Sequence, residues 1–208
     1  MHVLPHTDPG AVSKKLASLY GEVAFDIGAN CGQTIDRIHD RFNKIVSVEP
    51  AIESFTVLRD KWGEDEKVVL VQAACTDHVG TVELGERHET MMTGQLTTGE
   101  PGELPWGHTT GTRAVPATTV DQLTRAYGPP SMLKIDTEGH EVYVLKGAEE
   151  TLVSVRPLVF LEVHRRDLGA SCRSILLDAG YSSFDVIVHH VYQPGSWGHS
   201  NHYWLVAQ

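Results

Sequence analysis

The chain has 208 residues, of which 41% are hydrophobic and 21% are charged, as in an ordinary globular domain with a core of its own. It carries 17 basic and 27 acidic residues, a formal net charge of −10, and a chain this acidic repels a phosphate backbone. No apolar run reaches the roughly 18 residues that a membrane span requires. We therefore expect neither a nucleic-acid partner nor a membrane partner.

The cysteines give a further restriction on the class of protein. Cys31, Cys75 and Cys172 are widely spaced and form no CxxC pair, which argues against a thiolate zinc site or a disulfide framework. The first ten residues lack the basic and then apolar pattern of a signal peptide. A cytoplasmic protein is expected, because free thiols persist in a reducing compartment.

The hydrophobic pattern alternates between helices and short apolar strands along the whole chain. The first half predicts these elements in order: helix 11–20, strand 23–27, helix 33–42, strand 45–49, helix 52–62, strand 68–74 and a small antiparallel strand 81–84. The second half predicts a helix that starts after Thr119 and ends near Gly128, then strand 132–136, helix 141–152, strand 157–164, helix 171–179 and strands 184–189 and 202–206. Such alternation is typical of a single α/β domain, here over 1–208, with a Rossmann-like, seven-stranded, mainly parallel sheet and helices on both faces.

The segment 85–117 differs from the rest of the chain. It is rich in Gly, Thr, Pro and Glu and shows no steady period. An irregular segment of about 30 residues in a compact domain is more often a binding loop than a simple connection. We expect this segment to contact the substrate.

A glycine turn follows the first predicted strand and precedes a helix. It reads Asp26-Ile-Gly28-Ala-Asn30-Cys-Gly32, and its glycines let a ligand approach the backbone and the positive end of the helix. About 20 residues beyond this turn, Glu49 ends the next strand, where a nucleoside-binding fold holds a ribose diol. The spacing differs from the GxGxxG pattern of dinucleotide binders, which disfavours the alternative of a nicotinamide-dependent oxidoreductase.

Acidic side chains and one histidine lie at or near the ends of four predicted strands. They are Asp26, Glu49, Asp136, Glu162 and His164. In a parallel sheet the carboxyl ends of the strands meet at one edge, where ligands bind. We therefore expect these side chains to surround a single crevice.

The sequence resembles a known family at several of these positions. The glycine turn resembles motif I of the class I S-adenosylmethionine-dependent methyltransferases, and Glu49 resembles their ribose-binding acid. Downstream, 120–123, 133–141, 145–148 and 157–164 resemble the FkbM family of methyltransferases, with the run KIDTEGHE (134–141) as the most specific piece. His140 departs from the small or apolar residue that this family more often has there.

The resemblance implies a function and a role for individual residues. It implies S-adenosylmethionine as the cofactor and the O-methylation of a small natural product or a sugar as the reaction. Asp26, Gly28, Asn30 and Gly32 would line the methionine part of the cofactor, Glu49 would bind its ribose, Ala74 would border its adenine, and Asp136 would lie beside the methyl group.

The chemistry of methyl transfer then calls for activation of the acceptor. The hydroxyl must lose its proton as it attacks the methyl group in line, and a base that titrates near neutral pH assists this step. His164 is the first candidate base, and Asp136 and Glu138 are the next. The same carboxylates, together with Glu162, could instead hold a divalent cation that lowers the pKa of the hydroxyl. The non-enzyme alternative is a nucleoside-binding module without catalysis.

Overall fold

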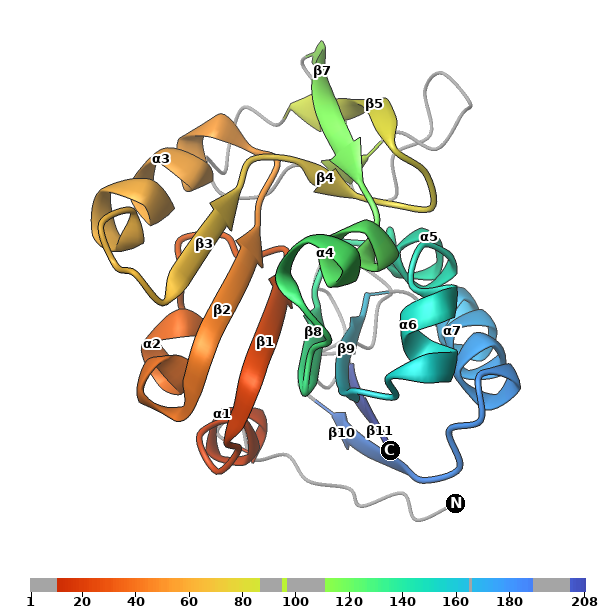
Figure 1. Ribbon diagram of the computed structural model, residues 1–208. Helices are drawn as coiled ribbons and strands as arrows, with labels where there is room; N and C mark the ends of the chain where they lie inside the picture. Colours follow the sequence, from red (N-terminus) through yellow and green to blue (C-terminus); the bar gives the residue numbers. More distant parts are fainter. Residues whose placement is uncertain (1–10, 87–94, 97–110, 165, 189–202) are drawn as a thin grey trace, which may run out of the picture.

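A seven-stranded, mainly parallel sheet forms the centre of the protein (Figure 1). The computed structural model describes residues 11–86, 95–96, 111–164, 166–188 and 203–208. The strands in spatial order are β10 (Phe184–Val188), β11 (Tyr203–Ala207), β9 (Leu158–Val163), β8 (Met132–Ile135), β1 (Gly21–Ile27), β2 (Phe42–Val48) and β3 (Val68–Val71). In this sheet β11 runs antiparallel to the other six strands, which share one direction. The predicted Rossmann-like architecture is thus confirmed.

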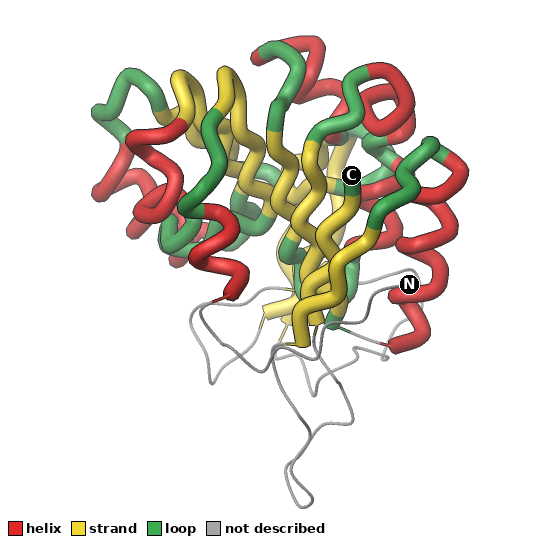
Figure 2. The backbone as a smooth tube through the Cα atoms, turned by 90° about the horizontal axis from the view of Figure 1, so that it is seen from below, coloured by secondary structure: helices red, strands yellow, loops and turns green. Residues whose placement is uncertain are grey.

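Helices cover both faces of the sheet (Figure 2). One face packs against α1 (Ala11–Leu16), α2 (Ile35–Ile38) and α3 (Ile52–Trp62), and the other packs against α4 (Val120–Tyr127), α5 (Glu141–Lys146), α6 (Glu149–Ser154) and α7 (Arg166–Asp178). Successive strand residues alternate between the faces. Ala24 therefore packs in the core on the side of α1, α2 and α3, and Phe25 packs in the core on the side of α4 to α7. Among the described helices, none is long and apolar enough to cross a membrane.

A second, smaller sheet lies beyond the carboxyl ends of β1, β2 and β3 (Figure 1). Its strands in order are β4 (Ala74–Cys75), β7 (Gly111–Thr118), β5 (Gly80–Glu86) and β6 (Gln95–Leu96). The strand predicted over 68–74 therefore ends early, because the chain turns after Val71 into this second sheet. The predicted strand 81–84 is part of β5.

The segment 85–117, predicted to be irregular, is in part regular. Its first residues end β5, and from Gly111 it forms β7, which pairs along the length of β5. Val115 and Ala117 are the buried residues of β7 within the segment, and Pro116 between them hides the alternation in the sequence. Residues 87–94 and 97–110 lie outside the described part of the chain, so the predicted substrate contact stays a prediction.

Three predicted helices are shorter than expected. The helix predicted over 11–20 is α1, which ends at Leu16. The helix predicted over 33–42 is α2 followed by a 3₁₀ turn, η1 (His39–Arg41), and Phe42 already opens β2. The helix predicted over 141–152 is divided into α5 and α6 at Gly147. A Cβ atom at Gly147 would lie 2.0 Å from the backbone oxygen of Thr76, so the helix breaks where another backbone segment passes against it.

The glycine turn after β1 brings two backbone segments into close contact. Gly28 has φ +75°, and a Cβ atom there would lie 1.8 Å from the backbone oxygen of Asp136, just after β8. Gly139 also has a positive φ, +102°, but a Cβ atom there would meet nothing within 4 Å. The two glycines therefore separate the cost of the backbone conformation from the cost of a steric clash.

Gly28→Ala and Gly139→Ala should differ in their effect on stability. The change at Gly139 should cost about 1 kcal/mol, because only the left-handed conformation is penalised. The change at Gly28 should lower the free energy of unfolding by roughly 3 kcal/mol or more, because the backbone at Asp136 must also move. Urea denaturation of both variants measures the difference, and equal losses would contradict this close contact.

His140 connects the end of β8 with the second sheet. Its Nε2 and the Thr76 hydroxyl are hydrogen-bonded at 2.9 Å, and its ring stacks on Tyr143 with a centroid distance of 4.6 Å. Burial lowers the pKa of His140 from 6.5 to about 4. His140 therefore has a packing role, which explains a histidine where the FkbM pattern is more often small or apolar.

Acidification should weaken the fold through His140. As the pH falls below 6.5 the unfolded chain takes up a proton first, so this contribution to stability is complete above pH 6.5 and is lost towards pH 4. Between pH 7.5 and pH 5 the loss should be roughly 2 kcal/mol. His140→Phe keeps the stacking on Tyr143 but cannot titrate, so its urea denaturation should show a correspondingly smaller loss. The same loss in both proteins would contradict the assignment.

Candidate functional site

A buried ion pair lies at the carboxyl ends of β1 and β8. Asp26 and Lys134 are register partners in these adjacent strands, so their side chains stand next to each other. Lys134 Nζ lies 3.1 Å from Asp26 Oδ1 and donates a hydrogen bond of 2.6 Å to the backbone oxygen of Gly28. It also lies 3.5 Å from Asp136 Oδ2. One ammonium group thus contacts two carboxylates and the glycine turn.

The charges of this group are set by burial and by one another. Burial alone would lower the pKa of Lys134, but Asp26 and Asp136 outweigh it and raise that pKa, so the ammonium group is charged. Burial raises the pKa of Asp26, whereas Lys134 opposes this effect. Removal of the lysine would therefore leave a buried carboxylate without its counterion.

A pocket of about 270 Å³ opens beside this ion pair. Gly28 and Asn30 of the glycine turn line it, together with Asp136 across from them. Its other lining residues are Val12, Ser13, Leu16, Ala29, Gln33, Thr34, Arg37, Lys134 and Trp204. Three of the predicted cofactor-binding residues therefore meet around one pocket, and Asp26 contacts its wall through Lys134.

Glu49 supports the glycine turn from the end of β2. Its Oε2 accepts a hydrogen bond of 2.9 Å from the backbone N–H of Asn30, and its Oε1 accepts one of 2.9 Å from Ala51. Burial raises the pKa of Glu49, and these two backbone donors lower it. Glu49 does not itself line the pocket, and the two bonds use only part of the acceptor capacity of a carboxylate.

Two other predicted cofactor-binding residues lie away from the pocket lining. A Cβ atom at Gly32 would stand 3.0 Å from both Leu58 and Trp62, so this glycine lets the turn pack against α3. Ala74 is buried in β4 of the second sheet, where it pairs with Ala117. Their predicted contacts with a cofactor stay predictions.

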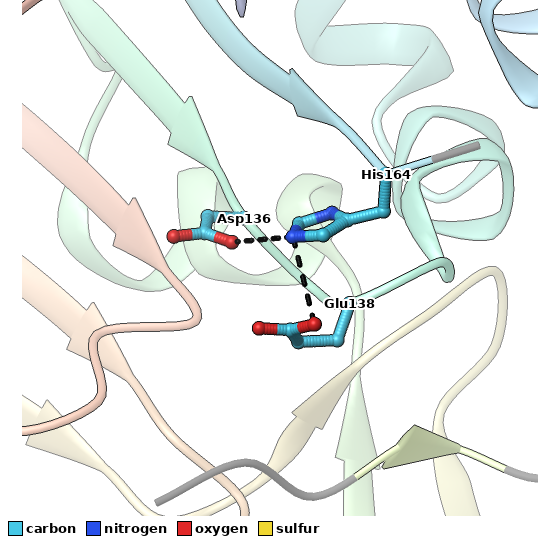
Figure 3. A group of neighbouring side chains, drawn as sticks. All are labelled: Asp136, Glu138 and His164. Atoms are coloured by element: carbon cyan, nitrogen blue, oxygen red, sulfur yellow. Dashed lines mark ion pairs between the residues drawn. The ribbon is translucent and has the colours of Figure 1, made fainter. Parts of the chain in front are cut away.

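The three predicted catalytic residues form one cluster (Figure 3). His164 Nε2 lies 3.5 Å from Asp136 Oδ1 and 3.6 Å from Glu138 Oε2. Asp136 and Glu138 follow β8, His164 follows β9, and these strands are neighbours in the sheet. Strand order therefore brings together residues that are far apart in the sequence.

Glu141 holds the other side of the His164 ring. This glutamate is fully buried at the start of α5, and its Oε1 lies 2.7 Å from His164 Nδ1. Burial alone would lower the pKa of His164, but Glu141, followed by Glu138 and Asp136, raises it to about 9. The imidazole is thus protonated at neutral pH unless another cation replaces the proton, so its role as a base stays a prediction.

Asp136 belongs to both groups of residues. Its Oδ2 faces Lys134 beside the pocket, while its Oδ1 faces His164. Glu162 is close enough for its charge to interact with both groups. Burial is the largest cause that raises the pKa of Glu162, and the charge of Asp136 is the next. A ligand in the pocket and a group bound at the cluster would therefore meet at Asp136.

Sequence reasoning missed Lys134 and Glu141 as members of the site. Both stand inside the run 134–141, which was singled out for its resemblance and not for these side chains. For Lys134 a signal was available: it is a charged residue inside an apolar strand, and a buried charge requires a partner. Glu141 gave no such signal, since an acid in the first turn of a helix is common on the surface.

The fold is shared with methyltransferases of known structure. The chain is similar to a methyltransferase FkbM from Methylobacillus flagellatus KT, with 16% identity over 92% of this chain and 47% of that chain, and a TM-score of 0.56. It is similar to precorrin-6y C5,15-methyltransferase from Geobacter metallireducens GS-15, with 14% identity over 100% of this chain and 94% of that chain, and a TM-score of 0.57. The chain thus spans about half the length of the Methylobacillus protein.

A third similar structure contains a cofactor. It is fibrillarin from Aeropyrum pernix with natively bound S-adenosyl-L-methionine, with 13% identity over 91% of this chain and 67% of that chain, and a TM-score of 0.55. At these identities the likeness concerns the fold alone. No curated protein sequence matches the chain.

The sequence itself gives the more specific result. The family model of the FkbM methyltransferase domain matches residues 26–183, which include the glycine turn, both strand-end clusters and most of the central sheet. The chain therefore belongs to the FkbM methyltransferase family.

Proposed function

We propose that the protein transfers the methyl group of S-adenosylmethionine to a hydroxyl of a small molecule. The observation that carries this proposal is the position of Asp136, with one carboxylate oxygen towards the pocket and the other towards His164. A cofactor in the pocket and an acceptor at the cluster would face each other across this residue. That is the arrangement which an in-line transfer needs.

The charges around the pocket suit S-adenosylmethionine. The cofactor carries a positive sulfonium and a positive ammonium group, and Asp26 and Asp136 provide negative charge near the pocket. Its carboxylate would find a cation in Arg37, which lines the same pocket. Glu49, linked to the pocket through Asn30, has acceptor capacity left for the ribose hydroxyls.

In the proposed reaction, the acceptor oxygen attacks the methyl carbon as the carbon–sulfur bond breaks. The products are a methyl ether and S-adenosylhomocysteine, and the hydroxyl proton leaves to a base or to water. Either His164, once it has lost its own proton, or a neighbouring carboxylate would take this proton. A divalent cation at the cluster is the other means of making the hydroxyl more acidic.

The nature of the acceptor follows from charge and chemistry. The net charge of −10 argues against a nucleic-acid acceptor, so we propose a small natural product or a sugar.

A cytoplasmic location is part of the proposal, because a reducing compartment suits the three free thiols, Cys31, Cys75 and Cys172.

Two alternatives make different predictions. A nicotinamide-dependent oxidoreductase is disfavoured by membership in a methyltransferase family and by the spacing of Gly28 and Gly32. A nucleoside-binding module without catalysis would bind the cofactor but transfer nothing. Binding and turnover must therefore be measured separately.

Calorimetry and a turnover assay test the proposal. We expect S-adenosylmethionine and S-adenosylhomocysteine to bind with micromolar affinity and NAD not to bind. A panel of sugars and hydroxylated natural products should then contain an acceptor that gains one methyl group by mass spectrometry. Preferential binding of NAD would overturn the cofactor assignment, and cofactor binding without transfer to any acceptor would favour the inactive module.

Glu49→Gln should weaken cofactor binding. Loss of a charge-assisted hydrogen bond to the ribose is worth about 1.5–3 kcal/mol, which corresponds to roughly a tenfold to hundredfold weaker affinity for S-adenosylhomocysteine. Glu53→Gln removes an exposed carboxylate from α3 and serves as the matched control, with unchanged affinity expected. An affinity that stays the same in Glu49→Gln, measured by calorimetry on a folded variant, would remove the ribose assignment.

A further inference from the structure

Several carboxylates converge on the imidazole ring of His164. Asp136, Glu138 and Glu141 surround the ring, and Lys134 contacts the other oxygen of Asp136. Three ligand-type atoms of this cluster, from Asp136, Glu138 and His164, lie within 4.8 Å of one another. Such convergence of one imidazole and two carboxylates is the composition of a metal site.

The orientation of His164 matches that of a metal ligand. Its Nδ1 contacts the fully buried carboxylate of Glu141 at 2.7 Å, which leaves Nε2 on the side of Asp136 and Glu138. Metal-binding histidines usually donate a hydrogen bond from their second ring nitrogen to a carboxylate or a carbonyl. This bond fixes the orientation of the ring and raises its basicity. Glu141 is itself fixed by a hydrogen bond of 2.8 Å from the backbone N–H of Gly139.

Two of the three ligand separations are close to those around a single ion, and all three ligand atoms lie within 4.8 Å of one another. Ligand atoms about 2.1 Å from an octahedral ion are about 3 Å apart when adjacent and about 4.2 Å apart when opposite. The observed separations of 3.5 Å and 3.6 Å are slightly wider than the adjacent value. Asp136 and Glu138 are about 30% exposed, so a small rotation of their side chains would close this gap.

We propose that Asp136, Glu138 and His164 bind one divalent first-row transition ion of the Mn²⁺ type, with Glu141 as a positioning residue for the imidazole. A ligand set with imidazole favours such an ion over Mg²⁺ or Ca²⁺, which prefer oxygen ligands alone. Three protein ligands leave open coordination positions for water or for the hydroxyl of an acceptor.

The role of this ion rests on the proposed methyl transfer. A hydroxyl bound to the ion would lose its proton to water more readily and attack the methyl carbon of S-adenosylmethionine as the carbon–sulfur bond breaks. Asp136 places the ion next to the cofactor pocket, because its other oxygen faces Lys134 at the pocket wall. The acceptor class is then a hydroxylated small molecule that can coordinate a metal.

Titration of the full chain with Mn²⁺ tests the site directly. Electron paramagnetic resonance of free Mn²⁺ should show one saturable site in the wild-type protein, with at least tenfold weaker binding of Mg²⁺ in competition. Glu138→Gln should weaken Mn²⁺ binding at least tenfold, because a carboxylate ligand becomes a neutral amide. Glu66→Gln, which removes an exposed carboxylate after α3, makes the same charge change away from the cluster and should leave the affinity unchanged.

Glu141→Gln tests the positioning role. Loss of this second carboxylate should weaken Mn²⁺ binding roughly tenfold to hundredfold while the affinity for S-adenosylhomocysteine stays the same. Circular dichroism and thermal denaturation of each variant check that it is folded. His164→Asn, if it folds, should lose the saturable site.

The outcomes separate this inference from the proposed function. Absence of a saturable Mn²⁺ site in a protein that binds S-adenosylhomocysteine would overturn the metal site alone, as would equal Mn²⁺ affinity in Glu138→Gln and the wild type. Binding of Mg²⁺ as tight as that of Mn²⁺ would overturn the imidazole as a ligand. A saturable, Glu138-dependent site in a protein that binds no S-adenosylmethionine would support the metal site and overturn the proposed function.

Discussion

The ion pair between Lys134 and Asp26 is the interaction on which the rest of the site depends. A buried ammonium group is costly unless carboxylates and hydrogen bonds compensate for the lost water. Here Asp26 and Asp136 provide the opposite charge, and the backbone oxygen of Gly28 accepts a hydrogen bond of 2.6 Å. The lysine thereby fixes three things at once: the glycine turn, the end of β1 and the end of β8. The glycine turn and the end of β8 line the pocket.

The order of the strands converts this local interaction into a two-sided site. Because β8 lies between β1 and β9, its carboxyl end meets Asp26 of β1 through Lys134 on one side and His164 through Asp136 on the other. The residues that would hold the cofactor come from β1, from the turn and helix after it, and from the end of β2. The residues that would act on the acceptor come from the ends of β8 and β9 and from the start of α5. Asp136 is shared by the two sides.

The strands and the carboxylates at their ends could be predicted from the sequence. The contacts between distant segments could not, because no local pattern encodes them. Apolar runs revealed all seven strands of the central sheet, since burial along one strand leaves a local pattern. Strand-end carboxylates could likewise be placed at one edge, because parallel strands share their direction. The partnership of Lys134 with Asp26 depends on strand order and register, which are properties of two segments 108 positions apart. The break at Gly147 depends in the same way on a backbone oxygen from Thr76, which no local pattern reports.

The two sides of the site also differ in how they are encoded. Half of the residues that line the pocket come from one short stretch, 28–37, and a compact pattern of this kind can be recognised in a single sequence. The side proposed to hold the acceptor combines Glu138, Glu141 and His164 from separate elements, and its geometry exists only after β8, β9 and α5 have packed. Family membership consequently indicates the chemistry of the cofactor side more directly than the identity of the molecule that receives the methyl group.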